Sequence, residues 1–440
     1  MLLLDSIAEM FGIIFTPVAL LLTFIILLRR VNILKILQPK FFLKSIFDYP
    51  ENSKKSPFRA LSLALAGTLG VGNITGVSSA LISGGPGSIF WMWIGALISI
   101  SVKYAEVYLA VLFRKKKKDG YIGGAMYYIR DGLSGIITKH SCQILASFFA
   151  VLCCLNSLIT GNLIQANAAV SVVEEENRIL CGIILSLLVL ISIIYGTHKI
   201  EKITSKVIPI LCSIYMIISL YIITVNIKFI PKIISDIISS AFSYRAIGGG
   251  AIGFGVREAV RFGIMRGIFS NEAGSGTSPT AHASAETKGP HNQGCFGIIE
   301  VFFDTIILCS MTAFVMLIAD KKYGIIPWLT ETDNAVVSLE AYGALTSPIV
   351  YYVLMISVVL FAYATIIAQL YYGYVAVGYL TGKKLPQFVY YALSVSVTTI
   401  GSIISPGIMW FFADIVIGTM TVANCCVIIL LRKKIRPPYR

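Results

Sequence analysis

The chain has 440 residues, of which 56% are hydrophobic and only 13% are charged. A soluble domain cannot bury so large an apolar fraction, so the composition excludes a soluble globular protein and predicts helices that lie in lipid. The net charge of +14 does not indicate nucleic acid, because the basic residues lie between the apolar runs, as the positive-inside rule for membrane proteins predicts.

Apolar runs long enough to cross a bilayer recur along the whole chain. A helix needs about 20 apolar residues to cross roughly 30 Å of hydrocarbon at 1.5 Å per residue. The pattern therefore predicts an all-α polytopic membrane protein with about 11 transmembrane helices. The predicted spans are 11–29, 58–83, 86–113, 143–172, 179–195, 207–224, 250–285, 294–318, 348–375, 387–404 and 406–431.

The basic residues are unevenly distributed between the two sides of this predicted membrane protein. With residue 1 outside, the inside segments hold 26 of the 36 Lys and Arg residues and the outside segments hold 6. Since basic loops stay in the cytoplasm, we expect a multi-pass plasma (cell inner) membrane protein with its N-terminus outside and its C-terminus cytoplasmic. Two amphipathic segments, 32–47 and 228–242, are expected to lie along the membrane surfaces.

The connections between the spans are too short to separate soluble domains, so residues 1–440 are expected to form one membrane domain. With the helix at 11–29 set aside as an extra N-terminal helix, ten predicted spans remain. They divide into a first repeat at 58–224 and a second repeat at 250–431. Because each repeat has an odd number of spans, the two lie inverted in the membrane, which predicts a five-plus-five inverted repeat.

Two of the predicted spans are poorly apolar at their centres and occupy corresponding positions in the two repeats. The first contains "AGTLGVGNITG" (66–76), and the second contains "FSNEAGSG" (269–276). Glycine-rich interruptions at matching positions are typical of secondary transporters with two broken helices. Unwinding frees N–H and C=O groups that lipid cannot satisfy, so the breaks are expected to bind a zwitterion and a cation, namely an amino acid with Na⁺ or H⁺.

A second interpretation of the first interruption remains open. Gly72 and Gly76 form a GxxxG pair, which also occurs where helices pack closely through small residues. A nucleotide-binding loop does not fit, because no strand precedes the segment and it has no Walker lysine.

Glu272 is an acid near the middle of a predicted span, where charged residues are costly and usually functional. One interpretation is structural, with Lys103 or an arginine pairing with it, or with Glu272 capping the half-helix near Gly274. The other is direct handling of an ion or a proton. Lys103 and Glu106 are three residues apart and are expected to form a structural pair near the inner edge.

The sequence lacks the patterns expected of an enzyme, a channel or a metal-binding protein. The four histidines are scattered, and no HExxH or Ser–His–Asp arrangement suggests an enzyme. No repeated filter segment suggests a channel. The nine cysteines include no CxxC pair and are expected to be free thiols rather than metal ligands. Nothing in the sequence indicates an oligomeric state.

Several short runs, taken together, resemble the alanine or glycine:cation symporter family (sodium:alanine symporters), whose members have a leucine-transporter-type fold. The runs occur in the family's order over nearly the whole chain. They are "AGTLGVGNITGV" (66–77), "GGPGSIFWMW" (84–93), "KYAEVYLAV" (103–111), "GGAMYYI" (123–129), "GNLIQAN" (161–167), "RGIFSNEAGSG" (266–276), "AHASAETK" (281–288), "DTIILCSMTA" (304–313) and "FAYATII" (361–367).

The resemblance implies sodium-coupled uptake of a small neutral amino acid, alanine or glycine, by alternating access. The alternative is a proton-coupled amino acid carrier in which Glu272 titrates. Among the site residues that the resemblance implies, backbone groups of the first break would bind the ammonium and carboxylate of the substrate. The expected substrate-binding residues are Gly67, Thr68, Val71, Gly72, Asn73, Gln165, Phe269, Ser270 and Gln369.

The same resemblance implies a sodium site that joins the first broken helix to the eighth helix of the repeat core. Its expected ligands are oxygens of Ala66, Leu69, Phe361, Ala364 and Thr365. The chain departs from the family pattern at two of the expected positions. Ala364 stands where a second threonine is usual, so one Na⁺ hydroxyl is missing, and Gln369 stands where a tryptophan is usual, which changes the size and polarity of the pocket.

For Gln165 and Thr365 a purely structural role was also open. Gln165 would then make an interhelical hydrogen bond, and the Thr365 hydroxyl would bond back to its own helix. Asn73 would either cap the second half-helix or hold the substrate. Arg257 and Arg261 would line an entry vestibule, extend to the membrane surface by snorkelling, or pair with Glu258.

Overall fold

The computed structural model describes residues 9–48, 56–117, 120–195, 197–242, 245–246, 253–330 and 334–438. The two chain ends and residue 250, the predicted start of the second repeat, lie outside the described residues.

Helices account for nearly all of the first half of the chain. The elements there are η1 (Phe11–Phe15), α2 (Thr16–Val31), α3 (Ile33–Ile36), α4 (Pro39–Phe47), α5 (Pro57–Thr68), η2 (Gly72–Gly76), α6 (Val77–Gly84), α7 (Gly87–Leu112), β1 (Lys115–Lys117), β2 (Gly120–Ile122), α8 (Ala125–Gly132), α9 (Lys139–Leu158), η3 (Ile159–Leu163), α10 (Ile164–Ser171), η4 (Glu175–Asn177), α11 (Arg178–Tyr195) and α12 (Thr197–Val225).

The second half is built in the same way. Its elements are η5 (Ile227–Phe229), α13 (Ile230–Phe242), β3 (Arg245–Ala246), β4 (Gly253–Phe254), α14 (Val256–Asn271), α15 (Pro279–Ala283), α16 (Pro290–Val301), η6 (Phe302–Cys309), α17 (Ser310–Tyr323), α18 (Asn334–Leu345), α19 (Pro348–Thr381), α20 (Lys384–Gly401), α21 (Pro406–Leu431) and η7 (Arg432–Lys434). The strands form two short antiparallel hairpins, β1–β2 and β3–β4.

Local signals explain where several helices begin. Ser56 precedes α5, and its hydroxyl accepts a hydrogen bond from the Arg59 N–H at 3.3 Å. Thr138 caps α9 in the same way, accepting from the Ser141 N–H at 3.1 Å. Pro57 occupies the first position of α5, where its missing N–H leaves no helical bond unmade.

The polytopic helical fold predicted from the sequence is confirmed, whereas the number of spans is not. Among the described residues, eight helices are long and apolar enough to cross a membrane. A ninth arises if α5 and the continuous helix Gly72–Gly84 are counted as one span, since they are bent by 50° at the break. The predicted spans 250–285 and 387–404, which overlap α14 and α20, are not among these nine, so the eleven-span topology remains a prediction.

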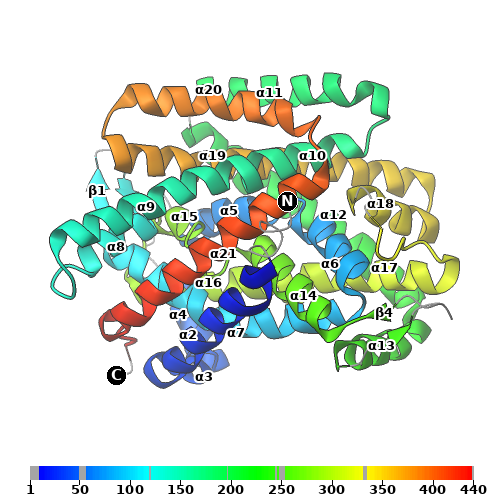
Figure 1. Cartoon of the computed structure of the whole chain (residues 1–440), viewed down its shortest axis with the longest axis horizontal. Coiled ribbons are helices and arrows are strands. Elements are labelled where there is room, and N and C mark those ends of the chain that lie inside the picture. Colours follow the sequence, from blue (N-terminus) through cyan, green and yellow to red (C-terminus); the bar gives the residue numbers. More distant parts are fainter. Residues whose placement is uncertain are drawn as a thin grey trace.

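Helices that occupy the same position in the two predicted repeats pack against each other. With the broken helices α5–α6 and α14–α15 taken as the first elements, the second elements α7 and α16 pack together, as do α9 with α19 and α11 with α20. Figure 1 shows α11 and α20 side by side along one edge of the molecule. This pairing is the arrangement expected of two inverted repeats.

The extra N-terminal helix lies outside this paired arrangement. The helix α2 packs along α21 and α7, and η1 reaches α14 (Figure 1). Gly12 permits that contact, because a Cβ built there would come within 2.9 Å of the Arg261 side chain.

Some local structure was not predicted. The connection between the predicted spans 294–318 and 348–375 contains the helix α18, whose Ser338 hydroxyl bonds to the Ser78 hydroxyl on α6 at 2.5 Å. The connection between the predicted spans 86–113 and 143–172 contains the β1–β2 hairpin and α8. The two amphipathic segments are helical as expected, since 32–47 forms α3 and α4 and 228–242 contains α13.

The close contact between α14 and α7 depends on Gly263. A Cβ added there would overlap the Ser88 carbonyl oxygen and approach the Met92 nitrogen to 3.1 Å, and backbone atoms cannot move aside. We therefore predict that Gly263→Ala lowers the free energy of unfolding by about 1–3 kcal/mol, the usual range for overpacking. Thermal unfolding in detergent measures the change.

Gly95, on the α7 side of the same contact, provides a matched control. A Cβ at Gly95 would have its nearest neighbour at 3.6 Å, an ordinary van der Waals distance. Gly95→Ala is therefore expected to leave the melting temperature unchanged or slightly raised, because alanine favours a helix by about 0.5–1 kcal/mol over glycine. Equal melting temperatures for the two variants would contradict the packing argument.

Candidate functional site

The first break interrupts the backbone hydrogen bonds of the helix between Thr68 and Gly72. The Gly70 N–H donates to the Thr68 carbonyl at 2.8 Å instead of the carbonyl four residues earlier. The Val71 N–H donates to Oε1 of Gln165 on α10 at 3.1 Å. The carbonyls of Ala66 and Gly67 therefore lose the N–H donors that an unbroken helix would supply.

The freed Ala66 carbonyl lies against the helix that was expected to share the sodium site. Thr365 Oγ1 on α19 donates to it at 2.9 Å, so the threonine bonds across to α5 and not back to its own helix. Gly70 makes the approach possible, because a Cβ there would overlap the Thr365 hydroxyl and lie 2.6 Å from Gln165 Oε1. The structure thus brings together two of the five expected sodium ligands.

The other three expected ligands lie on the same two segments and are buried. Leu69 is 1% exposed at the break, and Phe361 and Ala364 are 4% and 3% exposed on α19. No contact shows their carbonyls meeting at one point, so their role in the sodium site remains a prediction.

Two expected substrate residues of the first break face aromatic rings. A Cβ added to Gly67 would lie 2.7 Å from the Tyr372 hydroxyl, and a Cβ added to Gly72 would lie 3.2 Å from the Phe269 ring. The same Gly72 Cβ lies 3.3 Å from Cα of Ser270, so the two breaks are in contact at this point. The Thr68 hydroxyl bonds back to the Ala64 carbonyl at 3.2 Å.

Asn73 and Ser270 both bind an acid that the sequence reasoning did not single out. The Asn73 amide donates to Asp304 Oδ1 at 2.8 Å, and the Ser270 hydroxyl donates to Asp304 Oδ2 at 2.8 Å. Asp304 lies in η6 and is completely buried. A carboxylate inside the apolar run 294–318 was the signal in the sequence that could have identified it.

The second break begins where α14 ends at Asn271. Glu272 has a φ of 52°, the left-handed conformation that is uncommon for residues other than glycine. The Asn271 side chain accepts from the Ala273 N–H at 2.8 Å. Gly274 and Gly276, with φ of 88° and 76°, continue the turn until α15 begins at Pro279.

Two charged residues of α7 satisfy the backbone of the second break. Lys103 donates to the Asn271 carbonyl at 2.9 Å and forms an ion pair with Glu300 at 3.2 Å. Glu106 accepts from the Gly274 N–H at 3.2 Å and from the Asn424 amide at 2.8 Å. The predicted Lys103–Glu106 pair is therefore wrong, because both side chains turn toward the freed backbone groups of the break.

Among the described residues Glu272 forms neither an ion pair with Lys103 nor a capping bond at Gly274, although the Lys103 charge acts on it electrostatically. Its Oε2 accepts from the Thr277 hydroxyl at 2.6 Å, and its Oε1 accepts from the Gln369 amide. Gln369 is 2% exposed, and its Oε1 has no hydrogen-bond partner among the described residues. Gln369 on α19 thus forms a hydrogen bond with Glu272 of the second break and keeps one polar oxygen unpartnered among the described residues.

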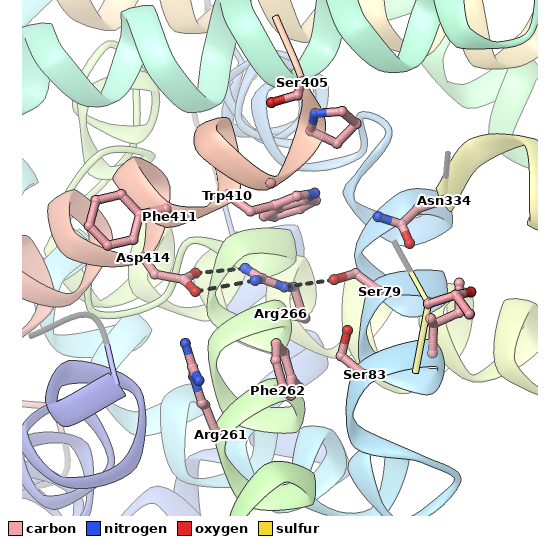
Figure 2. A pocket seen from close by; sticks show the side chains of 14 residues that line it. Ser79, Ser83, Arg261, Phe262, Arg266, Asn334, Ser405, Trp410, Phe411 and Asp414 are labelled. Atoms are coloured by element: carbon pink, nitrogen blue, oxygen red, sulfur yellow. Dashed lines mark hydrogen bonds and ion pairs between the residues drawn. The ribbon is translucent and has the colours of Figure 1, made fainter. Parts of the chain in front are cut away.

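A cavity of about 530 Å³ opens on one side of the breaks. Figure 2 shows the Arg266 guanidinium near its centre, flanked by Asp414 and Ser79, with the Trp410 ring beside it. The residues that line it are Ser79, Ile82, Ser83, Arg261, Phe262, Arg266, Thr330, Asn334, Ser405, Pro406, Gly407, Trp410, Phe411 and Asp414.

Four side chains separate this cavity from the breaks. Arg266 donates to both oxygens of Asp414, at 2.7 and 3.2 Å. The Arg266 guanidinium lies 4.0 Å from the centre of the Trp410 ring, and Trp410 packs edge-on against Phe269 with ring centres 4.6 Å apart. Because Trp410 lines the cavity and Phe269 lies against Gly72, the ion pair and the two rings form a closed layer between the cavity and the first break.

The expected pairing of Arg257 and Arg261 with Glu258 is not observed among the described residues. Arg257 pairs instead with Glu9 at 2.6 Å, and Arg261 lies 4.0 Å from the same carboxylate. Arg261 lines the cavity, which agrees with the vestibule interpretation.

A solved structure has a similar fold. A manganese transporter of Eremococcus coleocola matches 87% of this chain and 78% of its own length with a TM-score of 0.53, at 10% sequence identity. With its many membrane-spanning helices and two breaks in contact beside a cavity, the protein belongs to the class of polytopic helical membrane proteins.

Closer relatives define the family within that class. The model of the sodium:alanine symporter family matches residues 2–437. The sodium/alanine symporter AgcS of Methanococcus maripaludis is 34% identical over 94% of this chain and 91% of its own length. The probable sodium/glutamine symporter GlnT of Bacillus subtilis is 33% identical over 86% of this chain and 76% of its own.

The chain belongs to the sodium:alanine symporter family. It is a cation-coupled amino acid transporter of the membrane and not an enzyme, as the sequence predicted. The resemblance drawn from the short runs and the leucine-transporter-type fold are confirmed.

The closed layer gives a prediction about access to the breaks. Asp414→Asn removes one charge of the buried ion pair, so the Arg266 guanidinium loses its bidentate partner and the layer is expected to open more often. Cys309 lies directly behind the layer, 3.4 Å from the Ser270 hydroxyl, and is buried. We predict that a small charged thiol reagent modifies Cys309 several-fold faster in Asp414→Asn.

Mass spectrometry that resolves each cysteine measures this rate separately for Cys309. Cys426, which is exposed elsewhere on the protein, is the internal control and is expected to react at the same rate in both proteins. An unchanged rate at Cys309 would show that the ion pair does not control access to the breaks.

Proposed function

We propose that this protein couples the uptake of a small neutral amino acid, alanine or glycine, to the entry of sodium ions by alternating access. The observation that carries the proposal is the contact between the two broken helices at Gly72 and Ser270, together with the freed Ala66 carbonyl, which accepts from the Thr365 hydroxyl. Half-helix N–H groups suit a carboxylate, and carbonyl and hydroxyl oxygens suit an ammonium group or Na⁺.

In this proposal the amino acid lies between the first break and Phe269. Its carboxylate binds the amides near Val71 and Gly72, where Gln165 Oε1 now accepts from the Val71 N–H. Its ammonium group binds the carbonyl of Gly67, which the break frees, and the carbonyl of Thr68, which accepts from the Gly70 N–H in this structure. Gln165 would then release the Val71 N–H to the substrate.

The protein is proposed to lie in the cell membrane with its N-terminus outside. Two observations support this orientation. The Arg30 side chain donates to the carbonyls of Arg432 and Lys433, so the basic segments of α2 and of the C-terminal region gather at one end. The cavity opens beside Glu9, the first described residue, and would face the outside.

Proton coupling through Glu272 is the alternative. Glu272 is 6% exposed, and its described contacts are the neutral groups of Thr277 and Gln369. The Lys103 ammonium acts on Glu272 only at a distance and forms no ion pair with it among the described residues. A buried carboxylate without a cation in direct contact is costly unless it is protonated, which is the observation in favour of the alternative.

Uptake by proteoliposomes tests the coupling ion. An imposed Na⁺ gradient is expected to drive accumulation of labelled alanine or glycine, and Thr365→Ala is expected to raise the Na⁺ concentration needed by roughly 10-fold or more, as loss of a ligand does. Thr398→Ala is the control, because that buried threonine bonds only to its own helix in the described contacts.

Three results would count against this assignment. Equal uptake with and without the gradient would exclude sodium coupling. A change in substrate selectivity without a change in Na⁺ dependence in Thr365→Ala would exclude Thr365 as an ion ligand. Uptake driven by a pH gradient without Na⁺, and lost in Glu272→Gln, would establish the proton-coupled alternative.

The substrate is tested by ligand-induced stabilisation. Alanine or glycine at 100 times its dissociation constant is expected to stabilise the folded protein by about 2.7 kcal/mol, and only when Na⁺ is present. Glutamine is the informative competitor, because the unpartnered Oε1 of Gln369 offers an acceptor that alanine does not use. Stronger stabilisation by glutamine than by alanine would replace the proposed substrate.

A further inference from the structure

The segment that follows α2 carries basic side chains that the proposed function does not use. Residues 29–47 contain five Lys or Arg residues and no Asp or Glu. The basic residues are Arg29, Arg30, Lys35, Lys40 and Lys44. The segment forms the end of α2 and the short helices α3 and α4, and α3 lies at an outer edge of the molecule in Figure 1. The positive charge of this segment is therefore not compensated by its own residues.

The helix α2 sets the depth of α3 and α4 in the membrane. Its exposed side is apolar as far as Leu28, and the exposed Arg29 follows directly. Asn32, with a φ of 48°, then turns the chain out of α2 into α3. Exposed apolar side chains of a membrane span face hydrocarbon, whereas Lys and Arg at its end extend to the headgroups. The helices α3 and α4 therefore begin where the hydrocarbon gives way to the headgroups.

The exposed face of α4 combines apolar and basic side chains. Lys40, Leu43, Lys44 and Phe47 are all exposed. They are three and four residues apart, so they lie along one face of the helix. Leu43 and Phe47 are 52% and 66% exposed. Among the described residues neither Lys40 nor Lys44 forms an ion pair through its side chain.

The opposite face of α4 is fixed on the first turn of α16. Ser45 and Ile46 are buried, and the Ser45 hydroxyl lies 3.0 Å from Nε2 of His291. The Asn292 amide donates to the carbonyls of Ser45 and Asp48 at 2.9 and 3.1 Å. The protein thus holds α4 in one orientation, and the basic face is the one that it leaves uncovered.

Neighbouring segments leave this end of the molecule positive. Asp48, the acid that follows α4, forms an ion pair with Lys288. The Arg30 side chain donates to the carbonyls of Arg432 and Lys433, which brings the basic turn η7 to the same end. Carbonyls do not neutralise a guanidinium, so an anion is the electrostatic complement of this surface.

We propose that α3 and α4 bind the headgroups of anionic phospholipids, with the lysines on the phosphates and the leucine and phenylalanine side chains among the acyl chains. Basic residues beside a membrane span attract anionic lipids, and an amphipathic helix buries its apolar face at the same depth. A protein partner would first have to displace the lipid that the position of α2 places there. The proposal does not depend on the transported substrate or on the coupling ion.

The contact between α4 and α16 gives the lipid an effect on the whole fold. His291 joins α4 to α7 as well, because its Nδ1 lies 2.8 Å from the Tyr104 hydroxyl. A headgroup that binds α4 in its packed position favours the state in which α4, α16 and α7 are in contact. A ligand that binds only the folded arrangement raises its stability, so the anionic lipid is expected to stabilise the protein.

Fluorescence quenching by brominated lipids tests the surface directly. Phe47→Trp places a reporter on the exposed face of α4, and the unsubstituted protein supplies the background from its four native tryptophans. The full-length protein is reconstituted in phosphatidylcholine vesicles. We expect brominated phosphatidylglycerol to quench the added tryptophan more strongly than the same fraction of brominated phosphatidylcholine, and high salt to reduce the difference.

Removing the two lysines of the exposed face tests the recognition of charge. Each basic residue near an anionic membrane surface strengthens binding by about 5-fold. Lys40→Gln combined with Lys44→Gln, made in the Phe47→Trp protein, is therefore expected to weaken the preference for phosphatidylglycerol by at least roughly 10-fold. The two brominated lipids are then expected to quench equally.

A second pair of lysines provides a matched control. Lys383 and Lys384 are exposed in the connection between α19 and α20, on the same side of the membrane in the predicted topology. Lys383→Gln combined with Lys384→Gln removes the same charge away from α4. This variant is expected to retain the preference for phosphatidylglycerol at the reporter.

Thermal unfolding of the full-length protein in detergent measures the effect on the fold. Phosphatidylglycerol is expected to raise the melting temperature more than phosphatidylcholine at the same concentration, and the Lys40→Gln, Lys44→Gln variant is expected to lose this difference. Asn292→Ala removes the hydrogen bonds from α16 to α4 and leaves the lysines in place. It is expected to keep the preference in quenching and to lose the additional stabilisation.

Four results would overturn the proposal. Equal quenching by the two brominated lipids in the Phe47→Trp protein would show that the face lies in lipid without recognising charge. Quenching by neither lipid would show that a protein, either a partner or a second copy of this chain, covers the face. A preference that survives the loss of Lys40 and Lys44 would place the anion elsewhere. A preference without any difference in melting temperature would show that the contact does not reach α16.

Discussion

The structure depends on one constraint, which is that backbone groups freed in the middle of a membrane must find partners inside the protein. Both broken helices meet it with side chains from other helices. Gln165 takes the Val71 N–H, and Thr365 donates to the Ala66 carbonyl. Lys103 and Glu106 do the same for the carbonyl of Asn271 and the N–H of Gly274. The breaks therefore persist although they lack the usual helical bonds.

The buried charged side chains lie where they can form hydrogen bonds with the freed backbone groups of the second break. Lys103 serves the second break and also neutralises Glu300, whose other oxygen lies 2.9 Å from Nε2 of His282. Removing one member would leave an uncompensated charge in a dry interior, which typically costs 3–5 kcal/mol. The ionic groups on this side of the second break thus act as one scaffold, while Arg266 and Asp414 form a separate pair beside the cavity.

The two breaks are also tied to each other, which matters for a transporter. Gly72 lies against Ser270, and Asp304 accepts from both Asn73 and Ser270. Groups that hold both breaks respond when either one moves. A ligand bound among them has different contacts in each arrangement of the helices, which is the requirement for coupling its binding to a conformational change.

The sequence alone determined the membrane class, the positions of both breaks and the family, because apolar runs and glycine-rich interruptions are local features of the chain. It also predicted α3, α4 and α13 from their amphipathic pattern. It did not predict α18, which packs against α17 and α19, or the short hairpin β1–β2. The number of spans depended on α14 and α20, where apolar content is not decisive.

The partners of the charged residues were decided only by the tertiary structure. Spacing along α7 suggested that Lys103 and Glu106 pair with each other, but the second break offers each of them a freed backbone group. Glu272 drew attention in the sequence, whereas Asp304 did not, although it is Asp304 that contacts both breaks. Sequence shows which groups must be satisfied in lipid, and only the packing of distant helices determines which side chain reaches each of them.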